Sequence, residues 1–448
     1  MSGKCELFVL RDEEGPILYA PLRNLSARLN EAALCAVSRR INGRELSAED
    51  RECLSILEQS GFFTPAPLPE NVPRKPVQVT LFPSDGCNLR CRYCYAGAEK
   101  LRHRLSPEIG RAAIDYVAAN AKEQGMKDFV VGFHGNGEPF HAFPVLQELC
   151  RYAYEVGERT GLQPKLTAAT NGVLSDEQCD WLLAWFDGVN ISFDGLAELQ
   201  NTQRPMADGS GSFVYADKTL RRLNDSGKIF GIRSTVTAES VDRIPDIARF
   251  VLENYPRCDP LHVEPMWEAG RSLTTGVHTP LADRFIEKFL EAESILHGKM
   301  RLVFSAARSD FIDTSFCAVS RNSFVVTAEG NVTSCYEVCE YSDPRAERFI
   351  YGSYDPVSHS FVLDERKMEE LHTLHVRNIP YCENCFCKYS CCGDCAAKLL
   401  GNRMPSDHAG SERCAITRAL TLRQLADKLR YTDIAAADVG NALASASC

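Results

Sequence analysis

The sequence predicts an α/β fold in which a parallel sheet curls toward a barrel. Two observations lead to this prediction. Apolar strands alternate with helical stretches for over two hundred residues, and a tight group of cysteines directly follows the first of these strands. At 448 residues the chain is too long for one ordinary hydrophobic core, so we expect two or three domains.

The first 63 residues are predicted to form a separate unit. Strands are expected at Glu6–Leu10 and Pro16–Ala20, and helices near Arg28–Arg40 and Ser47–Ser60. Ser47 followed by acidic residues is typical of a helix start, because its hydroxyl can accept from a free backbone N–H. Residues 64–76 hold five prolines in thirteen positions, so they can neither continue a helix nor lie inside a sheet. We expect a linker there.

Residues 77–309 carry the alternating elements. Strands are expected at Val77–Phe82, Phe129–Phe133, Lys165–Ala169, Val189–Phe193, Gly231–Val236 and His262–Pro265, and helices at Pro107–Ala121, Asp176–Phe186 and Val241–Tyr255. Ser106 and Ser175 are the expected caps of the first two helices. Six such units predict a partial (βα)6 barrel of the TIM type, with its chemistry at the carboxyl ends of the strands.

Cys87, Cys91 and Cys94 form a CxxxCxxC pattern after the first barrel strand. A four-iron cluster needs four ligands, so three thiolates leave one iron open to a small molecule. Tetrahedral zinc would need another protein ligand nearby, and three structural cysteines are the plainer alternative. The N-terminus lacks the features of a signal peptide, so we expect a reducing compartment, where twenty cysteines indicate metal rather than disulfides.

The cysteine pattern resembles that of the radical S-adenosylmethionine (radical SAM) superfamily. The resemblance implies that the methionine part of SAM chelates the open iron. After the second strand, Gly135, Asn136, Gly137 and Glu138 resemble the family's Gly-Gly-Glu-Pro motif at the SAM amino group. Asn136 replaces the first glycine, which matters little if backbone atoms make the contact.

Four further residues are candidates for the same site. The resemblance places Ser192, at the end of the fourth strand, at the SAM ribose, and Asn171 closes the third strand. Arg233 is a charge in a strand that is otherwise expected to be buried, so it needs an anionic partner, and the SAM carboxylate fits. Tyr93 is placed near the adenine. Ser192 and Asn171 can instead be ordinary turn residues, and Tyr93 a core residue.

Seven cysteines in one register follow in the C-terminal third. They resemble the SPASM domain of radical SAM peptide and protein maturases, here at 310–420, with 421–448 as a C-terminal tail. Gly330 predicts a hairpin that brings the first two cysteines together. The resemblance implies two auxiliary iron–sulfur clusters, expected to be four-iron clusters, which brings the total to three. Their ligands would be Cys317, Cys335 and Cys395 for the first and Cys382, Cys385, Cys391 and Cys414 for the second.

The first auxiliary cluster then has only three cysteines. Cys339 is a candidate for the fourth ligand, or the site stays open for a substrate thiolate. Zinc is the rival occupant of the C-terminal cysteines, because it also accepts Cys pairs at this spacing.

The resemblance implies that an electron delivered to the first cluster cleaves SAM to a 5′-deoxyadenosyl radical, which abstracts hydrogen from an unactivated carbon. Residues 1–63 resemble winged-helix-like recognition domains, in which a leader peptide adds a strand to a sheet edge. A plain structural cap is the alternative. We therefore expect a ribosomally synthesised precursor peptide as substrate and an intramolecular cross-link as product, a thioether in preference to a carbon–carbon or carbon–oxygen bond.

Two other function classes remain open. One is an anaerobic sulfatase-maturating type of enzyme, which forms formylglycine on a protein substrate. The other is a non-catalytic iron–sulfur sensor. Candidate proton acceptors near the strand ends are Asp85, Asp194, Glu264 and Glu268, and the sequence ranks none of them.

The amino-acid composition limits the classes of molecule that we expect as partners. Apolar content of 44% and charged content of 25% are typical of soluble globular proteins, and no apolar stretch is long enough to span a bilayer. A net charge of −10 argues against nucleic acid as a partner. We expect a cytoplasmic protein without membrane contact. The resemblance adds a reducing partner such as flavodoxin or ferredoxin.

Overall fold

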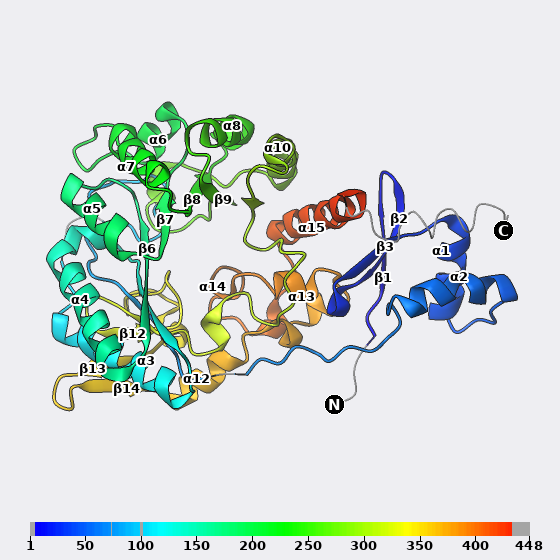
Figure 1. Cartoon of the computed structure of the whole chain (residues 1–448), viewed down its shortest axis with the longest axis horizontal. Helices are drawn as coiled ribbons and strands as arrows, with labels where there is room; N and C mark the ends of the chain where they lie inside the picture. The colour runs from blue at the N-terminus through cyan, green and yellow to red at the C-terminus, as the bar shows by residue number, and fades with distance from the viewer. Residues whose placement is uncertain (1–4, 73, 99–101, 432–448) are drawn as a thin grey trace.

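One large mixed sheet runs through most of the molecule (Figure 1). The computed structural model describes residues 5–72, 74–98 and 102–431. The strand order is β10-β9-β8-β7-β6-β5-β4-β11-β12-β13-β14. The strands are β4 (Gln78–Leu81), β5 (Asp128–Phe133), β6 (Gln163–Thr170), β7 (Gly188–Ser192), β8 (Phe230–Val236), β9 (Cys258–Pro265), β10 (Leu302–Val303), β11 (Val325–Val326), β12 (Asn331–Thr333), β13 (Ile350–Asp355) and β14 (Ser360–Leu363).

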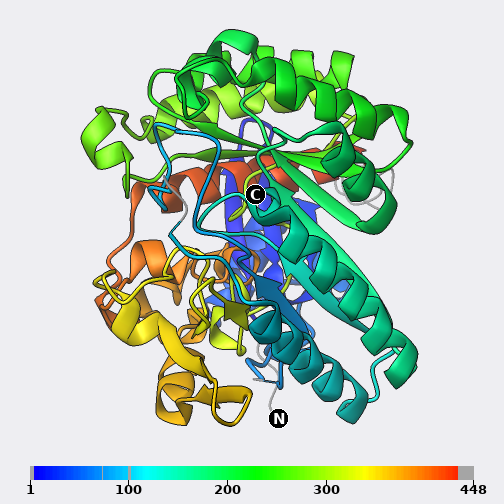
Figure 2. The ribbon, with the colours of Figure 1, turned by 90° about the vertical axis from the view of Figure 1, so that its left-hand side faces the viewer.

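Strands β4 to β9 are parallel and lie in chain order, as predicted from the alternating pattern. Helices connect them, and the longer ones lie along the outside of the curved sheet, from teal to green in Figure 2. They are α3 (Pro107–Glu123), α4 (Phe143–Thr160), α5 (Asp176–Trp185), α6 (Ala197–Gln203), α7 (Phe213–Asp225) and α8 (Ile244–Asn254). The short α9 (Ser272–Thr275) and α10 (Ala282–Leu296) follow β9. The caps explain the helix starts: Ser106 accepts from the N–H of Glu108, and Ser175 forms a capping box with Gln178.

The N-terminal unit is a three-stranded antiparallel sheet, β1 (Phe8–Asp12), β2 (Gly15–Ala20) and β3 (Leu25–Arg28), followed by α1 (Glu31–Ile41) and α2 (Ala48–Gln59). The sequence predicted only two strands and began the first helix near Arg28, which is wrong. Asn24 adopts a left-handed conformation with φ of 50°, which turns the chain back to pair β3 with β2. The helix begins instead after Asn30, whose side chain accepts from the N–H of Ala33.

The C-terminal third extends the barrel sheet rather than forming an independent layer. β11 pairs in parallel with β4, so that Val325 lies opposite Thr80, and β12, β13 and β14 follow as antiparallel strands. α11 (Ala346–Phe349) lies between β12 and β13, and β14 is followed by α12 (Glu365–His372), α13 (Lys388–Cys391), α14 (Ala396–Leu399) and α15 (Glu412–Tyr431). The sequence did not predict this continuity.

Helix α15 joins the two ends of the molecule. It continues across residue 420, so the expected boundary between 420 and 421 falls inside a helix, and residues 432–448 of the expected tail lie outside the described residues. Figure 1 shows α15 between the barrel and the N-terminal sheet, where Arg430 Nε lies 2.6 Å from Glu14 Oε1. The linker crosses from one unit to the other as an extended segment. None of the described helices combines the length and apolar character that a bilayer crossing requires.

Candidate active site

A cavity of about 300 Å³ lies at the carboxyl ends of the barrel strands. The structure brings together there every predicted residue of the radical SAM site: Cys87, Tyr93, Cys91, Cys94, Gly135, Asn136, Gly137, Glu138, Asn171, Ser192 and Arg233. The opposite wall comes from the C-terminal third, with Tyr336, Glu337 and Lys398. Both predicted metal-binding regions therefore contribute to one enclosed space.

The three thiols of the CxxxCxxC loop lie close enough for the charge of one to affect the pKa of another. Burial raises the pKa of Cys91 to about 12; the Arg204 guanidinium opposes this, and the charges of Cys94 and Cys87 raise it further. Among the described residues, no group of three His, Cys, Asp or Glu side chains is arranged to hold a single metal ion. A four-iron cluster is larger than one ion, and its positive irons deprotonate coordinating thiols. The loop fits such a cluster.

The glycine-rich turn packs directly on the start of the cysteine loop. The Glu138 N–H donates to Gly86 O at 2.8 Å, and a Cβ added at Gly137 would lie 2.3 Å from the same oxygen. Only glycine therefore fits at position 137. Asn136, the departure from the family motif, directs its side-chain amide toward Glu340 at 3.5 Å and leaves the backbone of the turn unobstructed.

Two of the predicted SAM-binding side chains hold other parts of the site. The buried carboxylate of Glu138 accepts from the Thr170 hydroxyl at 2.6 Å and from the Asn171 N–H at 2.8 Å. The Asn171 amide donates to Asn88 Oδ1 at 2.7 Å and approaches Cys87 Sγ at 3.7 Å. Together they fix the end of β6 against the cysteine loop.

Tyr93 belongs to a buried polar network. Its hydroxyl donates to Asp194 Oδ2 at 2.7 Å and accepts from Arg204 Nη1 at 2.8 Å. Arg204 also lines the cavity, and its Nε has no hydrogen-bond partner among the described residues. Arg204 was not predicted from the sequence, because a single arginine outside any motif carries no pattern.

Arg233 is the available cation of the cavity. It lies beside Ser192 on adjacent strands, and no described residue forms a hydrogen bond or ion pair with its guanidinium. The Arg233 side chain is exposed although its strand is mostly buried, so the expectation that a buried charge there requires an anionic partner is wrong. An exposed guanidinium that lines the cavity remains available to a carboxylate ligand. Burial and the charge of Arg233 lower the pKa of His134 to about 4, so its imidazole is neutral at pH 7, and it stacks on Tyr336 at 5.0 Å. The sequence analysis singled out neither ring.

The four candidate proton acceptors differ in their surroundings. Asp194 is committed to Tyr93, Asp85 accepts from His103, and Glu268 is paired with His278 at 3.2 Å. Glu264 is the one of the four that lines the cavity.

Glu264 is part of a network that reaches the C-terminal cysteines. Burial acts to raise its pKa, but the charge of Arg413 and a hydrogen bond from His262 hold the pKa well below the usual range. Arg413 lies 3.2 Å from Glu264 and 2.7 Å from Asp394. Since Arg413 precedes Cys414 and Asp394 precedes Cys395, this ion-pair network joins the barrel to both predicted auxiliary sites.

The C-terminal cysteines gather in two groups. Burial raises the pKa of Cys335 well above its usual range, and the charges of Cys395, Glu337 and Cys317 add to the effect. The hairpin turn at Gly330, with φ of 88°, lies between β11 and β12 as expected. The second group lines one small cavity: Cys382, Cys385, Cys391 and Cys414, together with Cys387, which the sequence analysis left outside the register.

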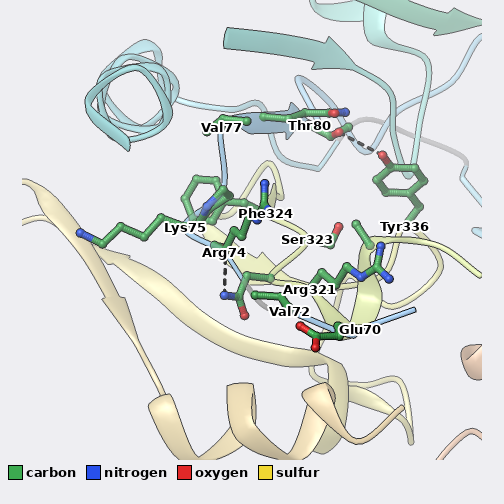
Figure 3. A pocket seen from close by; sticks show the side chains of 14 residues that line it. Glu70, Val72, Arg74, Lys75, Val77, Thr80, Arg321, Ser323, Phe324 and Tyr336 are labelled. Carbon is green, nitrogen blue, oxygen red and sulfur yellow. Dashed lines mark hydrogen bonds between the residues drawn. The ribbon is translucent and has the colours of Figure 1, made fainter. Parts of the chain in front are cut away.

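A larger cavity of about 670 Å³ lies behind the site (Figure 3). The linker, from Glu70 to Val77, forms one wall, and residues 318–324 form the other. Tyr336 lines both cavities, and its hydroxyl lies 3.1 Å from Thr80 Oγ1, as Figure 3 shows. This space could not be predicted from the sequence, because its walls are more than two hundred residues apart in the chain.

Residues 81–251 match the sequence model of the radical SAM superfamily. The chain is 29% identical over 218 residues to an Fe-coproporphyrin III synthase of Methanosarcina barkeri, covering 48% of this chain and 50% of that protein. The chain spans about half the length of the curated relatives it matches in this way. Among solved structures, anSMEcpe with bound AdoMet and Kp18Cys peptide aligns with a TM-score of 0.55, 18% identity and coverage of 79% and 99%. Streptococcus suis SuiB bound to its precursor peptide SuiA aligns with a TM-score of 0.53, 16% identity and coverage of 92% and 99%. These two structures share the fold.

Proposed function

We propose that this chain, whose residues 81–251 form a radical SAM domain, cleaves SAM and modifies a ribosomally synthesised precursor peptide. One observation carries the proposal: a single cavity joins the Cys87–Cys94 loop to residues that flank the C-terminal cysteines. A substrate bound there would touch both SAM and the auxiliary site. The N-terminal unit supplies a further argument, because its outer strands β1 and β3 offer sheet edges to an extended peptide.

The clusters, when bound, supply the electron that cleaves SAM to methionine and a 5′-deoxyadenosyl radical and accept the electron that the substrate later loses. The residues of this chain bind SAM and orient it for the reaction. Arg233 and Ser192 hold the carboxylate and ribose of SAM, and the backbone of Gly135–Glu138 receives its amino group. The surrounding walls exclude water from a reactive intermediate. We propose Cys317, Cys335 and Cys395 as ligands of one auxiliary cluster and Cys382, Cys385, Cys391 and Cys414 as ligands of the other.

The preferred product is an intramolecular thioether. 5′-Deoxyadenosine would carry away one hydrogen atom of the substrate carbon, the thiol would give up its proton, and an auxiliary cluster, when bound, would accept the remaining electron. The peptide therefore loses two hydrogens in all. SuiB, one of the structural neighbours, was solved with a precursor peptide bound, which supports the proposal of a peptide substrate for this chain. Formylglycine formation on a protein is the second candidate, since anSMEcpe with its bound peptide shares the same fold.

The first test measures SAM cleavage. Anaerobically reconstituted protein should form 5′-deoxyadenosine with dithionite, and Cys94→Ala should abolish it. Cys150→Ala is the matched control, because Cys150 is buried in the packing of α4 far from the predicted ligands in sequence. No 5′-deoxyadenosine from the unaltered protein, or full activity in Cys94→Ala, would exclude a radical SAM enzyme.

The second test identifies the substrate class. Coexpression with the peptides of short reading frames beside the gene, followed by mass spectrometry, should reveal a loss of two hydrogens. Deleting residues 1–63 should abolish this change while 5′-deoxyadenosine formation persists. Unaffected peptide turnover after the deletion would favour the formylglycine alternative, and an unchanged peptide mass with the full chain would count against cross-linking.

A further inference from the structure

The predicted first auxiliary site has three thiols and needs a fourth ligand. Cys339 is the sequence candidate, but its thiol donates to Tyr336 O at 3.2 Å and packs against Phe82 and Val325. It lines a small separate cavity with Ser84 and Asp85 rather than the cavity of the active site. The structure thus directs this sulfur away from the site that it was expected to complete.

Glu337, unlike Cys339, lies beside the predicted ligands of this site. Its N–H approaches Cys335 Sγ at 3.5 Å, which places the residue directly beside one predicted ligand. Its Oε1 lies 3.2 Å from Lys398 Nζ, and the Lys398 N–H donates to Cys395 O at 3.2 Å at the start of α14. The carboxylate is therefore held between the segments that carry Cys335 and Cys395.

One oxygen of this carboxylate has no hydrogen-bond partner. Glu337 Oε2 is buried and accepts from no described residue, and the Arg345 guanidinium remains 3.6 Å away. The side chain is only 15% exposed. Arg345 Nη1 is close enough to Oε2 for an ion pair but not for a hydrogen bond, so this oxygen of a largely buried carboxylate keeps an unused lone pair that is open to a metal.

The surroundings point to iron as that metal. Glu337 lies two residues after Cys335, with its N–H 3.5 Å from the Cys335 sulfur, and its carboxylate is tied through Lys398 to the segment that carries Cys395. An iron of the cluster that these thiols would hold is the positively charged group expected beside the carboxylate. Glu337 also lines the cavity that holds Arg233, so the residue lies next to the space where substrate would bind.

We propose that Glu337 is the fourth ligand of the first auxiliary cluster and is the ligand that a substrate thiol displaces. This proposal rests on the proposed function. A carboxylate is a weaker ligand for iron than a thiolate, so exchange favours the substrate sulfur. The exchange balances without an outside reagent, because the incoming thiol loses its proton and the released carboxylate accepts it.

The test uses full-length protein in which Cys87, Cys91 and Cys94 are all replaced by Ala, so that only auxiliary clusters are loaded. Mössbauer and EPR spectra are recorded after anaerobic reconstitution. Glu337→Gln should change the spectrum of one of the two clusters, and Glu337→Cys should restore a cluster with all-thiolate character. Lys398→Gln is the matched control, because it removes the ion pair and keeps the carboxylate; both clusters should keep their signals. Cys339→Ala should likewise leave both signals unchanged.

Unchanged spectra in Glu337→Gln would overturn the proposal, as would loss of a cluster in Cys339→Ala or equal effects of Glu337→Gln and Lys398→Gln. Addition of 2-mercaptoethanol to the protein with Glu337 should convert the same cluster signal toward the Glu337→Cys spectrum, and failure to do so would refute the exchange. Absence of any auxiliary cluster would instead refute the proposed function itself, which the iron content reveals separately.

Discussion

The close approach of two backbone segments at Gly137 allows a quantitative prediction. Gly137→Ala places a Cβ 2.3 Å from Gly86 O, whereas ordinary contacts lie at 3.4–4 Å. The two segments must therefore separate by about 1 Å, because both colliding groups are backbone and neither can rotate away. Overpacking of this size costs about 1–3 kcal/mol of stability. A displacement of about 1 Å in a substrate-positioning segment costs about 100-fold in rate.

Gly135→Ala is the matched control in the same turn. Its Cβ would meet Gly137 N at 3.4 Å, which is an ordinary contact. The assay is 5′-deoxyadenosine formation with SAM and dithionite, together with SAM affinity by equilibrium dialysis and the urea midpoint of unfolding. We expect a large loss in Gly137→Ala and a small one in Gly135→Ala. If Gly137→Ala binds SAM within twofold of the unaltered protein, the packing argument is wrong.

Two other predictions follow from the buried charges. Arg413→Met leaves two buried carboxylates without their positively charged partner and should lower the free energy of unfolding, measured by urea titration, by about 3–5 kcal/mol. Arg423→Met, which breaks a more exposed pair, should cost less than about 1 kcal/mol, and equal losses would contradict the reasoning. His134 has a folded pKa of about 4, below its value in the unfolded chain, so the unfolded state binds more protons and stability falls as the pH drops from about 6.5 toward 4. Between pH 7 and pH 5 the free energy of unfolding should therefore fall by up to about 2 kcal/mol less in His134→Gln than in the unaltered protein. If the free energy of unfolding of the variant depends on pH as it does in the unaltered protein, His134 is not held neutral.

The barrel was predictable because each of its signals is local. The alternation of a strand, a serine cap and the CxxxCxxC pattern can each be recognised within a short stretch of sequence. The carboxyl ends of parallel strands lie at the same end of the barrel, whatever the conformation of the connecting helices. The expected cofactor residues accordingly meet in one cavity. The N-terminal error has a local origin as well, since nothing in Leu25–Arg28 shows that Asn24 will turn the chain back.

The roles of individual side chains were harder to predict. Glu138 and Asn171 bond to neighbouring loops, and Cys339 turns away from the other cysteines; each outcome depends on a partner far away in the chain. Glu337, Lys398 and Arg204 belong to no spacing pattern at all. The role of such charged side chains depends on which sulfur or carboxylate groups the fold places beside them.

The ladder between β4 and β11 has a consequence for dissecting the molecule. A fragment that ends near residue 309 would contain every barrel strand, yet β4 would lose the neighbour on one side and present bare N–H and C=O groups to solvent. Such an edge recruits other chains, so the shortened protein should form insoluble aggregates rather than a minimal enzyme. The cysteine motifs suggest a boundary between the barrel and the C-terminal third, but the barrel cannot be expressed separately at that boundary.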